Sequence, residues 1–110
     1  MESATWDKIL ANYTDYRSQT DLYDEYSIVE TQNAKSVQTL FRDTFELAKQ
    51  DYKYLTELVM VLSHKMWYWY EINPSGSMVS AYSKCFEKAH NWALTHLNSD
   101  EIRYYKEVTD

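Results

Sequence analysis

A chain of 110 residues, 45% hydrophobic and 16% aromatic, has enough apolar material for one folded core and too little length for two. It contains one glycine and one proline, so it largely lacks the turn residues that strand-rich folds need often. We therefore predict an all-α fold. It is a compact bundle of four to five helices in a single domain, residues 1–110, around a central apolar helix at about residues 51–71.

The negative charge is concentrated near the N-terminus. The formal net charge is -6, and residues 1–32 hold seven acidic and two basic side chains. An acidic chain without a basic stripe is a poor ligand for a phosphate backbone, so we expect no direct nucleic acid binding. The acidic segment is either a solvated face or a surface offered to a basic partner. In the second case Asp21, Asp24 and Glu25 are candidate contacts.

The cysteine content and the N-terminal residues predict a cytoplasmic protein. Cys85 is the single cysteine, which excludes an internal disulfide and suits a reducing compartment. The first residues show neither a basic region nor the apolar run of a secretory signal. The apolar stretch at 51–71 contains Lys53, Glu57 and Lys65, so we expect no membrane insertion.

Two helices are expected before residue 33. Ser3 is a plausible N-cap for the first, whose apolar stripe begins at Trp6 and reaches Tyr16. A second, shorter helix is predicted at about residues 20–29. The polar sequence Thr-Gln-Asn that ends at Asn33 then predicts a gap, with Asn33 as the cap of the next helix.

Residues 34–50 form a clear amphipathic pattern, and its apolar phase continues into the central stretch without a slip. Two interpretations remain open. A continuous helix over 34–71 would be a rod of about 57 Å and would favour an elongated dimer. A break near Lys49 to Asp51, with Asp51 as a new cap, suits a domain whose expected radius of gyration is about 13 Å. We favour the break.

The central stretch has a broad apolar face and only a narrow polar strip, which predicts a helix covered on several sides. Its last four aromatic residues point about 100° apart in a helix, so they cannot all face one core. Either flanking helices bury all four, or one or two of them lie in an interface, where Trp and Tyr are enriched. The candidate interface residues here are Trp67, Tyr68, Trp69 and Tyr70.

The one strong turn contains Pro74, which ends the central helix, and Gly76, which permits positive φ. Ser77 is expected to cap a helix that extends to about Leu97. Ser99, followed by two acidic residues, is expected to begin a last short helix.

The histidines do not form a recognisable catalytic or metal-binding pattern. Glu87 and His90 form one Glu-x-x-His pair, whereas di-iron bundles need two such pairs and two further glutamates. Glu57 and His64 share the polar strip of the central helix, where a solvated role is the simpler interpretation. We predict no metal site and no cofactor.

Cys85 and His96 fall on one face of the helix after the turn, but about 16 Å apart along its axis. A nucleophile and its base must be within hydrogen-bond reach, so the two cannot act as a pair. Cys85 is expected to be a small buried residue, and His96 to bond the last carbonyls of its helix. No catalytic residue is predicted.

These observations favour a small cytosolic helical interaction or regulatory protein that occupies a partner's surface; its bolder form is an inhibitor or decoy. Two alternatives remain. One is a homodimeric structural protein that uses the region from Trp67 to Tyr70 as its interface. The other is a metal- or small-molecule-binding bundle. A ligand pocket needs convergent polar groups, and the sequence does not locate them.

Overall fold

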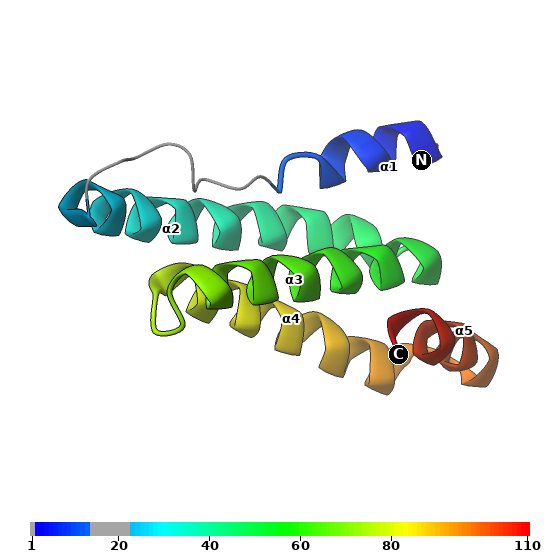
Figure 1. Ribbon diagram of the computed structural model, residues 1–110. Coiled ribbons are helices and arrows are strands. Elements are labelled where there is room, and N and C mark those ends of the chain that lie inside the picture. Colours follow the sequence, from blue (N-terminus) through cyan, green and yellow to red (C-terminus); the bar gives the residue numbers. More distant parts are fainter. Residues whose placement is uncertain (1, 14–22) are drawn as a thin grey trace.

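The computed structural model describes residues 2–13 and 23–110, without the side chains of Ser3 and residues 23–33. This part of the chain forms helices and no strands, so the all-α prediction is confirmed. The helices are α1 (Ser3–Leu10), α2 (Tyr23–Ala48), α3 (Tyr52–Ile72), α4 (Ser77–His96) and α5 (Ser99–Thr109) (Figure 1).

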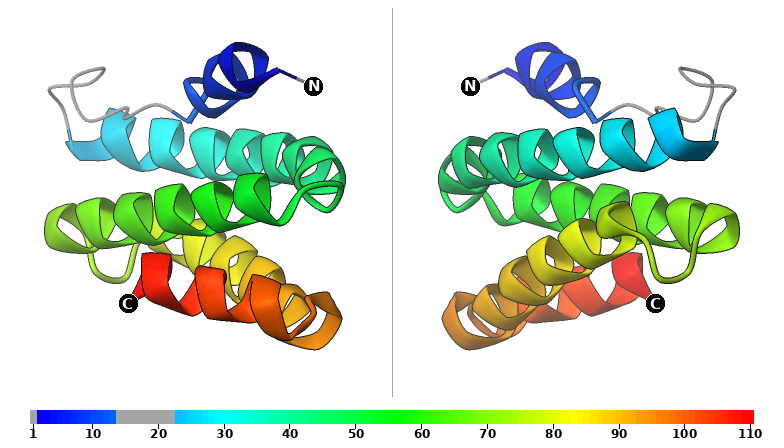
Figure 2. Two further views of the ribbon diagram at one scale, coloured as in Figure 1. Left: turned by 90° about the vertical axis from the view of Figure 1, so that its right-hand side faces the viewer. Right: turned by 90° about the vertical axis from the view of Figure 1, so that its left-hand side faces the viewer.

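The apolar helix α3 is central to the bundle, as the sequence predicts. It packs against each of the other four helices, and α2 also packs against α4. Figures 1 and 2 show α1 on one side of the α2–α3 pair and α4 with α5 on the other. The core between these layers is built from large side chains of every helix. Those of α1, α3, α4 and α5 include Trp6, Trp69, Tyr82 and Tyr105, all fully buried.

The chain breaks between α2 and α3 where we expected it. α2 ends at Ala48, and the side chain of Asp51 accepts a hydrogen bond of 2.9 Å from the backbone N–H of Lys53. This cap satisfies one of the donors that a helix start leaves without a partner. The longest dimension of the molecule is 48 Å, shorter than a continuous rod over 34–71 would be.

The predicted gap before Asn33 is wrong. α2 runs without interruption from Tyr23 to Ala48, so Asn33 lies inside the helix and not at its start. Thr, Gln and Asn each cost only about 0.5 kcal/mol in a helix. The packing of the buried face that starts at Ala34 outweighs this cost. Of the predicted short helix, residues 23–29 are the first part of α2, and residues 20–22 lie outside the described part of the chain.

Several helix ends differ from the prediction by one residue or more. α1 begins after Glu2 and stops at Leu10, so Tyr13 is buried beyond the helix end, and Tyr16 lies outside the described residues. The N-cap of α4 is Gly76, whose φ of -79° uses no positive-φ freedom. α5 starts after Asn98, which forms a capping box with Glu101.

Candidate interaction surface

The four consecutive aromatic residues of α3 separate as helical geometry requires. Trp69 is fully buried and Tyr68 is half-buried. Trp67 is 58% exposed and Tyr70 is 47% exposed. The rings of these two exposed residues meet edge to face, with centroids 5.5 Å apart. Two of the four candidate interface residues are therefore accessible to a partner; their role in an interface stays a prediction.

Trp67 is exposed because α5 covers only the first part of α3. At the start of α3, Tyr52 meets Tyr104 of α5 with ring centroids 5.2 Å apart, and Thr56 one turn later is fully buried. Trp67 lies on the same side of α3, about three turns beyond Thr56. Figures 1 and 2 show the last turns of α3 extending past the C-terminal end of α5. The face of α3 that α5 would continue to cover is thus left open.

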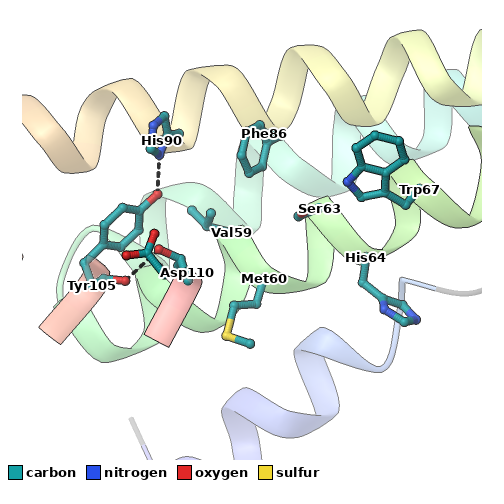
Figure 3. Close-up of a pocket in the computed structure, with 10 residues that line it drawn as sticks. Val59, Met60, Ser63, His64, Trp67, Phe86, His90, Tyr105 and Asp110 are labelled. Atoms are coloured by element: carbon teal, nitrogen blue, oxygen red, sulfur yellow. Dashed lines mark hydrogen bonds between the residues drawn. The ribbon is translucent and has the colours of Figure 1, made fainter. Parts of the chain in front are cut away.

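A groove of about 450 Å³ opens at this place between α3, α4 and α5 (Figure 3). We call it the α3–α4–α5 groove. In Figure 3, Phe86 and His90 point into it from α4, and Met60 and His64 lie at its outer edge on α3. Its lining consists of Val59, Met60, Ser63, His64, Trp67, Phe86, His90, Tyr105, Thr109 and Asp110.

The floor of the groove is ordered by a hydrogen bond and by stacked rings. Nδ1 of His90 and the hydroxyl of Tyr105 share a hydrogen bond of 2.6 Å. The rings of Phe86 and His90 stack at 5.5 Å with an interplanar angle of 8°. Burial raises the pKa of Tyr105 to about 12, so its hydroxyl keeps its proton at neutral pH. These contacts fix the aromatic floor before any ligand arrives.

The groove lining is apolar and aromatic with an acidic edge. Asp110 is its carboxylate, and Thr109 beside it ends α5. Among the described residues, the lining includes two histidines, His64 and His90, but no lysine or arginine. The groove therefore shares the negative sign of the whole chain.

Glu57 belongs to a different contact from the one its spacing suggested. Its carboxylate accepts a hydrogen bond of 2.9 Å from Nε1 of Trp6, and so holds α1 on α3. The two members of the Glu-x-x-His pair have separate surroundings. His90 is hydrogen-bonded to Tyr105, and Glu87 is exposed. Among the side chains that the structure describes, those of residues 2, 4–13 and 34–110, no three from His, Cys, Asp or Glu are grouped closely enough to hold a metal ion.

Cys85 and His96 are not brought together. Cys85 is buried, as expected, and burial raises the pKa of its thiol to about 11. His96 is exposed rather than on the buried face that the periodicity indicated. Its ring stacks on Trp92 at 4.4 Å, and its Nδ1 lies 3.1 Å from the carbonyl oxygen of the same residue. His96 thus bonds a carbonyl one turn before the end of α4, and not one of the last four carbonyls that we expected it to bond.

The acidic candidate contacts cannot be placed on a surface. Asp21 lies outside the described residues. Asp24 and Glu25 lie in the first turn of α2, but their side chains are also outside the described part. Their role stays a prediction.

Of the ten residues that line the groove, only Trp67 is among the interface residues that the sequence predicts; Met60 and Tyr105 were not candidates, and His90 was considered only as a possible metal ligand. One signal for the groove was present. Met60 and Trp67 are seven residues apart, so they lie on one side of α3, and both are large apolar residues next to the polar strip. Met60 is 44% exposed. An apolar pair beside a polar strip is as typical of an exposed surface patch as of a side that a second helix covers.

No family model, no curated protein and no solved structure matches this chain. Among the helices of the described residues, none combines the length and the hydropathy needed to cross a bilayer.

Proposed function

We propose that this protein acts by binding another protein in the α3–α4–α5 groove, and that it regulates that partner by occupying part of its surface. The observation that carries the proposal is Trp67, which is 58% exposed at the edge of a groove with an aromatic floor. Tryptophan is the residue type most enriched among those that dominate binding energy. An inhibitor or decoy is the specific form of this role in which the occupied surface is the partner's working site.

The occupant that suits the groove is an amphipathic helix of the partner. The groove begins where α5 stops, so a helix placed there would continue the cover of α3 along the line of α5. Helix-in-groove recognition uses apolar anchors on one helix face. Trp67 and the half-buried Phe86 offer apolar surface for such anchors.

Charge favours a basic partner over a second copy of this chain. The chain carries a net charge of -6, and the groove has an acidic edge at Asp110 and no lysine or arginine among the described residues that line it. Two copies would therefore meet with charges of the same sign, whereas a basic segment is attracted. The proposed role is binding, and it includes no catalytic step.

Site-specific cross-linking in the host cell tests this proposal. A photoreactive phenylalanine derivative replaces Met60 in the groove or, as a matched control, Leu94, which is 42% exposed on α4 outside the groove lining. We expect one protein to be cross-linked from position 60 and not from position 94. Equal capture at both positions, or none at position 60, contradicts the proposal.

The captured protein is then purified and its affinity measured for three forms of the full chain. Trp67→Ala is expected to weaken binding about tenfold or more, as the loss of an aromatic residue that dominates the binding energy does. Leu94→Ala is expected to change the affinity less than about twofold, because most contacts outside the central cluster are nearly neutral. Circular dichroism of both variants shows that the fold is kept.

Sedimentation at high micromolar concentration tests the alternative occupant. We expect the full chain to sediment as a monomer. A dimer that Trp67→Ala dissociates would place a second copy in the groove and would replace the proposed partner.

A further inference from the structure

We infer that the α3–α4–α5 groove contains a subsite for a cationic group, and that this group is a lysine or arginine side chain of the bound partner. The inference rests on the proposed function, because the cation is carried by the partner's segment. It names what the groove recognises beyond apolar surface.

The first support is the ring surface of the groove. Trp67 of α3 and the half-buried Phe86 of α4 line the same opening; Tyr105 of α5 lines it as well, but its ring is fully buried. The face of an aromatic ring attracts a cation through its quadrupole, and tryptophan does so best. Because Trp67 is more than half exposed, part of its surface is available to a partner.

The second support is the electrostatics of the end of α5. The C-terminal end of a helix carries the negative pole of its macrodipole and favours cations nearby. α5 ends at Thr109, and both Thr109 and the carboxylate residue Asp110 line the groove. A carboxylate and a helix C-terminus thus act in the same direction at this edge of the groove, and the one basic residue in the last turn of α5, Lys106, is exposed and is not among the lining residues.

The third support is a comparison with another aromatic cluster of the same chain. At the end of α2, the ammonium group of Lys49 lies 4.4 Å from the ring centre of Phe45 and 5.7 Å from that of Trp92. There the chain supplies its own cation to the rings. The groove has rings and a carboxylate, but no lysine or arginine in its described lining. A partner can therefore supply the missing charge.

A pair of small probes tests the chemistry without the partner. Choline and 3,3-dimethylbutan-1-ol have the same shape, but only choline is charged. Each is titrated into the full isotope-labelled chain, and binding is followed by chemical shifts, including the indole N–H of Trp67. We expect choline to bind at least about fivefold more tightly than the neutral isostere, as a partly exposed cation–π site allows.

Three variants assign that preference to named groups. Asp110→Asn is expected to reduce the preference for choline, and Trp67→Leu to remove most of it, since leucine keeps apolar surface but has no ring. Trp67→Phe restores a ring and is expected to recover part of the preference. Leu94→Ala serves as the unchanged control. Equal binding of the two probes, or shifts confined to residues outside the groove, overturns the inference.

The partner identified by cross-linking tests the source of the cation. Replacing each lysine and arginine of its bound segment by methionine is expected to weaken binding about tenfold or more at one position at least, and choline is expected to compete. If choline binds preferentially but every such position is dispensable, a free organic cation is the ligand and the inference fails. If position 60 captures no protein while choline is still preferred, the proposed function fails and the cation chemistry of the groove stands.

Discussion

The two sides of α3 use tryptophan in opposite ways. On the α1 side, Trp6 is fully buried, stacks on Tyr54 at 4.8 Å and donates a hydrogen bond to Glu57. On the α5 side, Trp67 is mostly exposed and touches Tyr70 of its own helix. The comparison teaches that residue type alone does not decide burial here, and that the side of a helix on which a residue lies decides it only together with its neighbours. For Trp67, the reach of the neighbouring helix decides it.

The largest expected effect on stability is on the α1 side of α3, where the tryptophan is buried. Trp6→Ala removes a fully buried indole and leaves a cavity between α1 and α3, so we expect a loss of about 3–5 kcal/mol in the free energy of unfolding. Urea denaturation followed by circular dichroism measures it. Trp6→Phe, which keeps the ring against Tyr54, is the control and is expected to cost less. A loss below about 1 kcal/mol would show that α1 contributes little to the bundle.

The hydrogen bond on the same side is expected to contribute less than the buried ring. Glu57→Ala removes the carboxylate that accepts from Nε1 of Trp6, and we expect a loss of about 1.5–3 kcal/mol for a bond to a charged group. Glu57→Gln keeps an acceptor and is expected to lose less than half as much. Equal losses for Ala and Gln would mean that the charge, and not the hydrogen bond, is what matters at this position.

On the α5 side of α3, Tyr105→Phe tests how much the hydrogen bond at the base of the groove contributes to stability. The variant loses the hydrogen bond to His90 but keeps the ring, so a loss of about 1 kcal/mol is expected at neutral pH. The pKa of Tyr105 is raised by burial from 10.0 to about 12, which means that the folded state binds this proton more tightly than the unfolded state. That contribution to stability is complete below pH 10 and is lost as the pH rises through about 12.

Urea denaturation between pH 9 and 12 therefore distinguishes the wild-type chain from Tyr105→Phe. Wild-type stability should fall more steeply than that of Tyr105→Phe, and the difference between them should shrink as the pH rises. The buried Cys85, whose pKa is raised to about 11, contributes in the same direction to both forms and so cancels in the comparison. Parallel pH profiles would contradict the assignment to Tyr105.

The smallest expected effect is at the most exposed tryptophan. Trp67→Ala should change the free energy of unfolding by no more than about 0.5 kcal/mol, because the residue lies at the surface. Its proposed effect is on binding alone. A loss comparable with that of Trp6→Ala would show that Trp67 is a structural residue and would remove the reason for placing an interface there.

Local signals in the sequence sufficed for the helical class and for the bounds of α3, α4 and α5, but not for those of α1 and α2. The break before α3 was predictable because Asp51 is a good capping residue and a continuous rod is too long for a small domain. The gap before Asn33 was predicted wrongly because cap-forming residues also occur inside helices when packing on the rest of the helix is strong.

The groove could not be derived from the same signals. Whether Trp67 is buried depends on where α5 ends, and the residues concerned, Trp67 and Thr109, are 42 positions apart in the sequence. Helical periodicity gives the side of α3 on which a residue lies, but not which helix covers that side or how far it reaches. The contact between His90 and Tyr105 is of the same kind, since it joins two helices whose relative placement no local pattern specifies.

The unequal exposure of the four tryptophans has an optical consequence. Trp6 and Trp69 are shielded from water, and Trp92 stacks on His96. The emission of Trp67 should therefore dominate the red edge of the fluorescence spectrum and be the component most readily quenched by iodide. A ligand that enters the groove would shift this emission to shorter wavelengths and protect it from the quencher. The chain thus carries its own fluorescent reporter at the place where we propose that it binds.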